Sequence, residues 1–433
     1  MSNQELRLGL YEADLNPALG LPIAGYTYQK IASGFHDRLY VKAISLRSRD
    51  DRVLLASVDT CGVGKQMCAE IKQEMETRHG VPSDNVVILA THSHSAPDTL
   101  AWSLRWNKRT SPEIEEAMVS NRDRTREIIS WSLSQAMAFE EPVSSVHFSS
   151  VRTPGLFTNR EDRSRKIDDT VTVMMMKGKK SALILNHHYH PTVLGANNYD
   201  YSADFPAYLT ERVKEKIGVD QVNCITGACG EVSVRLVLGD EFAPRRNIAN
   251  TMKYGVRLAD YVVRSLKFAK QLKDFALNSQ VRHLKLDVKK KPTWEETRAL
   301  KQDLEDRIKR AKNAREKTAL EFRLEGVIFW LDTLDLYGGQ LPSTLDADVG
   351  AVKLGADGLA FAWAPAEICS HTGFVVKERS RYKVTMLSGY GNGIIGYMPS
   401  AQSYKNQEYE ALSTPVTETA IDRIEEALTS MVS

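Results

Sequence analysis

The chain has 433 residues, which is long enough for one large domain or about two to three ordinary ones. Its 57 Lys and Arg against 55 Asp and Glu give a formal net charge of +2, and no polybasic run occurs, so binding to nucleic acid through the phosphates is not expected. No apolar run approaches the roughly 20 residues that span a bilayer. The start of the chain lacks a basic flank followed by an apolar region, which predicts a cytoplasmic protein without an export signal. The five cysteines include no CxxC pair, so neither a disulfide framework nor a cysteine zinc site is indicated.

The first third of the chain mixes strands and helices. Alternating, β-branched residues predict strands at 39–48 and 53–59, joined by a hairpin turn. A helix is expected over 63–79, ended by a glycine, and a short apolar run at 85–91 predicts a buried strand. A Ser-Pro pair, typical of an N-cap and first helical position, predicts a helix from 111 to about 140.

The middle of the chain continues this mixture. The segments 170–176 and 181–190 predict another hairpin, and helices at about 206–217 and 247–272 flank a strand at 222–227. Hairpins combined with strand–helix alternation predict an α/β fold with mixed β-sheets and flanking helices.

Charged residues dominate the segment 292–325. A threonine followed three residues later by glutamate, Thr293 and Glu296, predicts a capped helix start, and the segment is expected to form a solvated helical hairpin with i,i+4 ion pairs. The alternative, an arm that binds a partner, rests on charge alone. Because no repeat or low-complexity linker divides the chain, we expect a single domain over 1–433.

Two histidines follow the predicted buried strand in ILATHSHSAPD (88–98). His92 and His94 are two residues apart, so in an extended chain both imidazoles project to one side. Two imidazoles in a loop at a strand end suit a divalent cation such as zinc. The alternative is that His92 caps a turn and that His94 faces solvent.

A second histidine group lies at the end of another apolar strand, in NHHYHPT (186–192). In an extended chain His188 and His190 share one face, and His187 lies on the other. Five of the ten histidines of the chain lie in these two short segments, which favours a metal site over histidines that merely fill the core.

A third candidate is the small-residue segment TGACGEVSVR (226–235). Its glycines allow a sharp turn that leaves Ser233 accessible. The segment is not a GxSxG motif, and a glycine-rich turn with a capping serine explains it equally well.

Taken in order along nearly the whole chain, these segments resemble the catalytic domain of the neutral (alkaline, non-lysosomal) ceramidases. The opening IAGYTYQKIASGFHDRLYVKA (23–43) is similar to the family's glycine-tyrosine, glutamine and glycine followed by an arginine-rich strand. THSHSAP is similar to the family's THTHSGP, which implies His92 as a metal ligand. YHPT matches the segment of the second metal histidine, which implies His190 rather than His188.

Further along the chain, Asn159-Arg160 resembles the family's asparagine-arginine element, whose arginine points into the site. GEVSVR resembles GDxSPN and brings Ser233 to the position of the active-site serine. APAEICSHTG (364–373) is similar to PGE(P)xTxxG, which implies Glu367 as the acidic ligand.

The last similar segment is GYGNGIIGYMPSAQSYKNQEYEALST (389–414), which is close to the family's GLxNxYxGYxxTxxxYxxxxYEGxST. This match implies Tyr397 as the ligand tyrosine and Tyr409 as a second tyrosine of the site. The family resemblance therefore implies a catalytic-domain fold of the neutral ceramidase kind over the whole chain.

The resemblance also implies an activity: a hydrolase with one Zn²⁺ ion, in which water activated by the metal attacks an N-acyl amide bond. His94 is suited to pass a proton to the departing amine, and Arg160 and Tyr409 to donate hydrogen bonds to the developing oxyanion. Ser233 would hold the polar head of the substrate or the reacting water. Whether this serine is instead a nucleophile stays open, and we favour the non-covalent role.

Three departures from the family favour a polar N-acylated or sugar-like substrate over ceramide. The export signal and the C-terminal immunoglobulin-like domain usual in the family are not expected here. GEVSVR lacks the family's proline and adds Arg235 near the serine. Trp102 and Trp106 lie among cationic residues in 100–110, where they either cover the core in an ordinary amphipathic helix or form a pocket rim suited to a polar or anionic ligand.

Two other classes of function remain. The same metal pocket in a carbohydrate-active enzyme would serve as a glycoside hydrolase or lyase, and the fold could also belong to a non-catalytic binding protein. Retention of every implied metal ligand speaks against the binding protein. In each case the expected partner is a small molecule, and the sequence is silent on the oligomeric state.

Overall fold

A computed structural model describes residues 5–26, 30–49, 51–100, 111–234, 237–238, 241–242, 247–290, 293–336 and 342–433. The predicted α/β class with mixed sheets and flanking helices is confirmed. Over these ranges, no helix combines the length and the apolar character that crossing a membrane requires. The predicted tryptophan-rich stretch 100–110, apart from Leu100, and Arg235 lie outside the described residues.

The larger sheet contains nine strands among the described residues, with parallel and antiparallel neighbours mixed. Both predicted hairpins are present as antiparallel pairs within it. In spatial order its strands are β11 (Gln221–Thr226), β9 (Ala182–His187), β8 (Thr170–Gly178), β6 (Glu141–Arg152), β1 (Leu6–Asp14), β3 (Tyr40–Ser48), β4 (Asp51–Val58) and β5 (Val86–Ala90), with β15 (Lys270–Leu272) beside β6.

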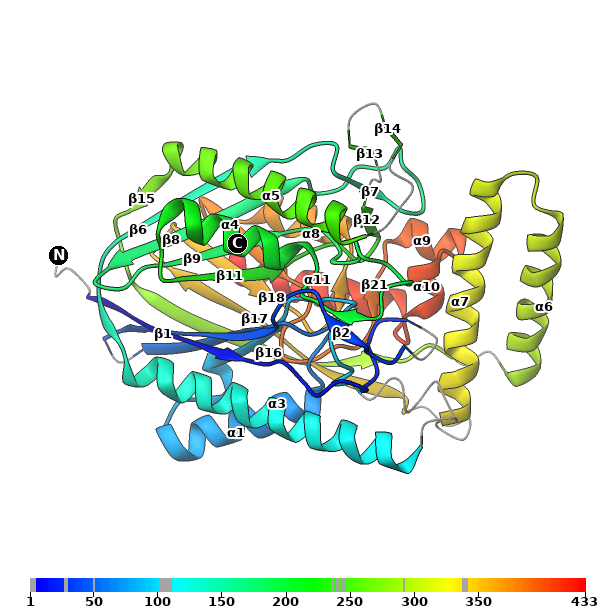
Figure 1. The fold of residues 1–433 in the computed structure, drawn as a ribbon, viewed down its shortest axis with the longest axis horizontal. Helices are drawn as coiled ribbons and strands as arrows, with labels where there is room; N and C mark the ends of the chain where they lie inside the picture. Colours follow the sequence, from blue (N-terminus) through cyan, green and yellow to red (C-terminus); the bar gives the residue numbers. More distant parts are fainter. Residues whose placement is uncertain are drawn as a thin grey trace.

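Helices pack on one face of this sheet in two groups, which lie at opposite sides of the molecule (Figure 1), and the smaller sheet packs on the other face. α3 (Pro112–Ala138) lies along β1, β3 and β4, and α1 (Lys65–His79) packs beside α3 and β5. α4 (Phe205–Ile217) packs on α5 (Ile248–Ser265) beside β11. The caps follow the sequence, because a left-handed Gly80 ends α1 as predicted. The predicted N-cap Ser111 accepts a hydrogen bond from the amide of Ile114 at the start of α3.

The strands of a smaller sheet all come from the C-terminal part of the chain. Its strands are β16 (Leu277–Asp287), β17 (Thr344–Leu354), β18 (Leu359–Trp363) and β20 (Val384–Ser388), and α8 (Ser370–Arg379) and α11 (Glu418–Val432) pack beside them. The shorter elements are η1 (Ser83–Asn85), η2 (Leu266–Phe268), β2 (Gly34–Phe35), β7 (Phe157–Asn159), β10 (Asp200–Tyr201), β12 (Val232–Val234), β13 (Val237–Leu238), β14 (Glu241–Phe242), β19 (Glu367–Ile368), β21 (Tyr397–Met398), α9 (Ala401–Asn406) and α10 (Tyr409–Ser413).

The prediction of one helix over 247–272 was wrong at its C-terminal end, because the observed helix is shorter. α5 stops at Ser265, a single 3₁₀ turn follows, and Lys270–Leu272 forms the edge strand β15 against β6. Pairing with an existing strand satisfies the backbone of these residues without a longer helix, and this long-range partner is not visible in the local sequence.

The predicted charged hairpin is present but is longer and less solvated than expected. It comprises α6 (Trp294–Arg310), which begins with the predicted capping box of Thr293 and Glu296, and α7 (Ala314–Leu336). The hairpin stands at one end of the molecule, and α7 lies against α10 (Figure 1). Val327 and Trp330 of α7 are buried, so this face of the hairpin is part of the packed structure.

Candidate metal centre

Two parallel strand ends bring the predicted histidines together. His92 follows the end of β5 by two residues, and His190 follows the end of β9 by three. β11 lies beside β9, and the hydroxyl of Thr226 at the end of β11 donates to the carbonyl of Thr91, just after β5. This hydrogen bond holds the end of β5 close to the ends of β9 and β11. The chain is not extended at this point, because His92 has a φ of 65°, an unusual backbone conformation for a residue other than glycine.

Backbone carbonyls fix the orientation of both imidazoles. Nδ1–H of His92 donates to the carbonyl of Cys61 at 2.6 Å, and Nδ1–H of His190 donates to the carbonyl of Cys229 at 3.1 Å. A carbonyl can only accept, so the proton of each neutral ring lies on Nδ1 and the lone pair on Nε2. This is the arrangement of metal-binding histidines, whose second nitrogen is held by the protein.

The two lone pairs converge with a carboxylate. Nε2 of His92 lies 3.0 Å from Nε2 of His190, and Oε2 of Glu367 lies 3.3 Å from the first nitrogen and 4.0 Å from the second. All three side chains are buried. Two imidazole nitrogens that converge with a carboxylate are the donor set that zinc takes in proteins, so the residues fit a zinc-type ion.

A short parallel strand pair places the carboxylate next to the predicted ligand tyrosine. Glu367 in β19 is the register partner of Tyr397 in β21. Tyr397 is buried, which raises its pKa well above the usual value, and its ring packs edge-on against Tyr409 at 5.6 Å. The two-stranded pair thus explains how residues 30 positions apart meet at one site.

His94 lies as close to the centre as the two predicted ligands. Its Nε2 is 3.1 Å from Nε2 of His92 and 3.0 Å from Nε2 of His190. Burial lowers the pKa of His94 well below its usual value, which favours the neutral ring. Gly25 makes room for this ring, because a Cβ at that position would lie 2.3 Å from Nδ1.

Arg160 occupies the other side of the tyrosines. Its guanidinium lies 4.9 Å from the ring centre of Tyr409 and 5.5 Å from that of Tyr397. Its Nε donates to Oε1 of Glu410 at 2.7 Å. Burial raises the pKa of Glu410 to about 7, and the charge of Arg160 opposes that rise. The predicted arginine and second tyrosine are therefore brought together with the carboxylate that follows the tyrosine in sequence.

Ser233 lies on β12, where it is the register partner of Thr158 in β7. Arg160 follows β7, and its amide donates to the carbonyl of Glu231, so the serine segment and the arginine segment are neighbours. Among the described residues, no hydrogen bond joins Ser233 to the histidines or to Glu367. The remaining histidine of interest, His188, contacts Lys377 at 2.8 Å and lies outside the converging group.

Two residues of this centre were missed by the sequence reasoning. Glu410 was passed over although it stands inside the matched motif. Tyr390 was also missed. The sequence does mark this position, because a tyrosine stands there in place of the leucine of the family's GLxN motif. Its hydroxyl lies 3.5 Å from Oε2 of Glu367, and its ring stacks on His92.

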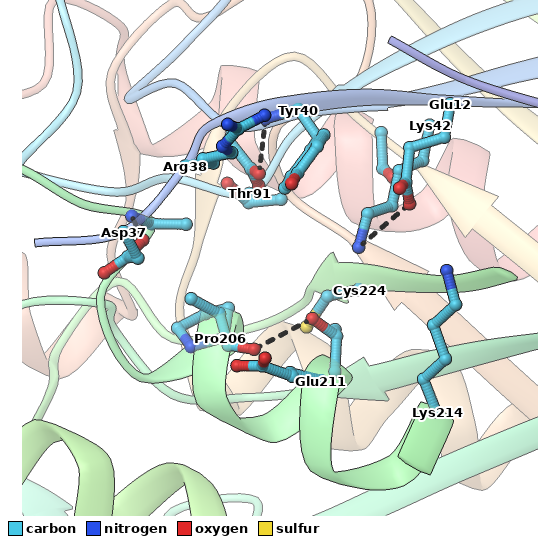
Figure 2. A pocket seen from close by; sticks show the side chains of 15 residues that line it. Glu12, Asp37, Arg38, Tyr40, Lys42, Thr91, Pro206, Glu211, Lys214 and Cys224 are labelled. Carbon is cyan, nitrogen blue, oxygen red and sulfur yellow. Dashed lines mark hydrogen bonds and ion pairs between the residues drawn. The ribbon is translucent and has the colours of Figure 1, made fainter. Parts of the chain in front are cut away.

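A separate pocket of about 450 Å³ opens between β3 and α4 (Figure 2). Figure 2 shows Glu12 and Lys42 on one wall opposite Glu211 and Lys214 of α4. The residues that line it are Glu12, Asp37, Arg38, Tyr40, Lys42, Ser57, Asp59, Thr91, Ala203, Pro206, Ala207, Thr210, Glu211, Lys214 and Cys224. None of the predicted site residues is among them, so this pocket is distinct from the histidine centre.

Comparison with known proteins identifies similar sequences and folds. The sequence model of the neutral/alkaline non-lysosomal ceramidase N-terminal region matches residues 7–128. The neutral ceramidase of Pseudomonas aeruginosa has the same fold, with a TM-score of 0.76 at 16% identity, over 100% of this chain and 74% of that one. A structure described as ceramidase complexed with C2 gives a TM-score of 0.75 at 16% identity, over 99% of this chain and 75% of that one.

The resemblance predicted from the motifs is therefore confirmed. Residues 7–128 match the N-terminal sequence model of the neutral/alkaline ceramidases, and the whole chain is similar in fold to neutral ceramidase. This relationship supports a ceramidase-like hydrolase.

Proposed function

We propose that the protein is a zinc-dependent hydrolase that cleaves an N-acyl amide bond. His92, His190 and Glu367 hold one Zn²⁺ ion, and Tyr397 is its fourth protein ligand. Zinc, when bound, supplies a Lewis acid and makes hydroxide available near neutral pH. The observation that carries the proposal is the convergence of two Nε2 atoms, 3.0 Å apart, on Oε2 of Glu367, with both Nδ1 atoms held by carbonyls.

The other residues of the site act on the substrate in this proposal. Arg160 and Tyr409 donate hydrogen bonds to the oxygen of the scissile carbonyl as negative charge develops on it. His94, neutral in the buried site, takes up the proton of the reacting water on Nε2 and passes it to the departing amine. Ser233 binds the polar head of the substrate or the reacting water.

The surroundings of Arg160 favour a polar N-acyl compound over a lipid with two alkyl chains. Glu410 pairs with Arg160 directly, and the charge of Arg160 also opposes rises in the pKa values of Glu161 and Glu325. Glu161 and Glu325, which keep contact with water, would lose hydration against long hydrocarbon chains, whereas hydroxyl or amine groups of a polar substrate can hydrogen-bond to them.

The proposal is tested by metal content and substrate cleavage together. The purified protein is loaded with zinc, its zinc content is measured, and it is assayed on a short-chain N-acylsphingosine, on N-acyl amino acids and on aryl glycosides. His92→Ala removes a proposed ligand. The matched control is His283→Ala, which removes an exposed histidine of β16.

The expected result is one zinc per chain in the wild type and in His283→Ala, loss of zinc and of cleavage in His92→Ala, and faster cleavage of the N-acyl amino acids than of the sphingosine derivative. Equal zinc content in His92→Ala would contradict the metal site. Cleavage of glycosides alone would replace the amidase with a carbohydrate-active enzyme on the same metal pocket.

A further inference from the structure

Tyr390 touches three supports of the proposed metal centre. Its ring stacks on the imidazole of His92, with centroids 3.9 Å apart and an interplanar angle of 21°. Its hydroxyl lies 3.5 Å from Oε2 of Glu367 and 3.2 Å from Sγ of Cys229. The side chain is only 1% exposed, so these contacts are shielded from water. No other described aromatic ring stacks on one of these three residues.

The backbone around Tyr390 is fixed without help from its side chain. The amide of Ala90 donates to the carbonyl of Tyr390 at 3.1 Å, just before the turn that carries His92. The side chain of Asn392 accepts from the amide of Ile88 and donates to the carbonyl of Val86. The loop therefore runs along the edge of β5, and replacement of the ring leaves this attachment in place.

Tyr390 contacts Oε2 of Glu367, the carboxylate oxygen that is proposed to bind the metal. Oε2 of Glu367 is also the atom that faces Nε2 of His92 at 3.3 Å. When the thiol of Cys229 donates to the phenol oxygen, the phenol O–H is left to donate to Oε2 over 3.5 Å, and this restricts rotation of the carboxylate. The ring stacked on His92 restricts tilt of the imidazole. Cys229, the third contact, supplies the carbonyl that holds Nδ1 of His190. One side chain thus contacts two proposed ligands, and also the residue whose carbonyl holds the third.

We propose that Tyr390 is a positioning residue of the metal centre, which holds His92 and Glu367 in the orientation that binds zinc. This inference rests on the proposed function. A leucine, the residue of the family motif at this place, fills space but can neither stack as an aromatic ring nor donate a hydrogen bond. The phenol is therefore a feature by which this chain adjusts the affinity and geometry of its own metal site.

The test compares Tyr390→Phe, which keeps the stacked ring and removes the hydroxyl, with Tyr390→Leu, which removes both. Zinc affinity is measured by competition with a chromophoric chelator, and the visible absorption of the Co²⁺-loaded protein reports the coordination geometry. Thermal melting of the metal-free proteins checks folding. Tyr201→Phe is the matched control, because Tyr201 is a fully buried tyrosine whose hydroxyl donates to the carbonyl of Leu21, away from the proposed ligands.

We expect zinc to bind about 10-fold more weakly to Tyr390→Phe, more weakly again to Tyr390→Leu, and unchanged to Tyr201→Phe. The Co²⁺ spectrum should shift in both Tyr390 variants. Wild-type affinity and an unchanged Co²⁺ spectrum in both variants would overturn the role of Tyr390 while leaving the metal site intact. A wild-type protein that binds no zinc would overturn the proposed function and this inference with it.

Discussion

Single backbone carbonyls decide what the two central histidines can do. The carbonyls of Cys61 and Cys229 accept from Nδ1 of His92 and His190, and this leaves both Nε2 atoms unprotonated and facing each other. If Nδ1 had no such acceptor, the proton of the neutral ring could lie on either nitrogen. The ring would then be less well prepared to bind a metal through Nε2. The metal chemistry proposed here therefore depends on the backbone carbonyls of two cysteines.

A second residue-level contact is the buried pair of Arg160 and Glu410. The carboxylate is 1% exposed and the guanidinium 14%, so neither charge is well hydrated. Glu410→Ala leaves the arginine charge without its partner, and we expect it to lower the free energy of unfolding by about 3–5 kcal/mol, measured by urea denaturation. Because Glu410 contacts none of the proposed ligands in the described structure, zinc content should not change.

The control for this prediction is Asp357→Ala, which breaks the exposed ion pair with Lys383. Exposed pairs contribute at most about 1 kcal/mol, so this variant should unfold close to the wild type. Equal stability of the two variants would show that the Arg160–Glu410 pair is not needed for folding.

The sequence predicted most of the candidate ligands but not their supports. His92, His190, Glu367 and Tyr397 could be named because each stands in a short motif with its own residue pattern. The roles of Cys61, Cys229 and Tyr390 could not be predicted, although the last two stand in segments singled out from the sequence. They contribute a carbonyl or a ring to histidines that lie far away along the chain, and no motif spacing records such contacts.

Among the elements, the hairpin of α6 and α7 bears on the site more directly than its charged sequence suggested. Trp330 of α7 donates from its indole N–H to the carbonyl of Leu412 in α10, the helix that also carries Tyr409 and Glu410. The prediction of a solvated hairpin was wrong for this face, because the apolar residues of α7 find their partners on α10, about 80 positions later in the chain.

We expect Trp330→Ala to loosen α10 and hence the placement of Tyr409. The loss of a buried tryptophan costs about 3–5 kcal/mol, and kcat/KM should fall while zinc content stays at the wild-type value. Trp131→Ala is the matched control, because this tryptophan of α3 is 57% exposed and should be replaceable with little effect. Unchanged kcat/KM in Trp330→Ala would show that the hairpin does not support the site.

At the scale of the whole molecule, the larger sheet was predictable in its local hairpins and not in its strand order. The pairs β3–β4 and β8–β9 follow from adjacent segments with a turn between them. The parallel pairing of β9 with β11, and of β4 with β5, depends on helices that return the chain across the sheet. These parallel pairs align the strand ends that carry the histidines, so the order of the strands determines the site.

The polar pocket beside β3 predicts a pH dependence of stability. Burial raises the pKa of Asp59 to about 6. An unfolded aspartate has a pKa of about 3.9, so between about pH 4 and 6 the folded protein binds more protons and the free energy of unfolding falls as pH rises. Asp59→Asn removes this titration, and urea denaturation should find it more stable than the wild type at pH 8 by about 1–3 kcal/mol.

At pH 4 the same variant should show little advantage, because Asp59 is then protonated in the folded wild type. Asp357→Asn, at an exposed position, should keep the pH dependence of the wild type. A wild-type slope in Asp59→Asn between pH 4 and 6 would mean that other groups carry the effect.

The central claim is that His92, His190 and Glu367 hold one zinc ion. X-ray anomalous diffraction from crystals of the zinc-loaded protein, recorded on both sides of the zinc absorption edge, tests it most directly. The account predicts a single strong anomalous peak among Nε2 of His92, Nε2 of His190 and Oε2 of Glu367, and none in crystals of His92→Ala. A peak elsewhere in the molecule, or none in the fully loaded wild type, would contradict it.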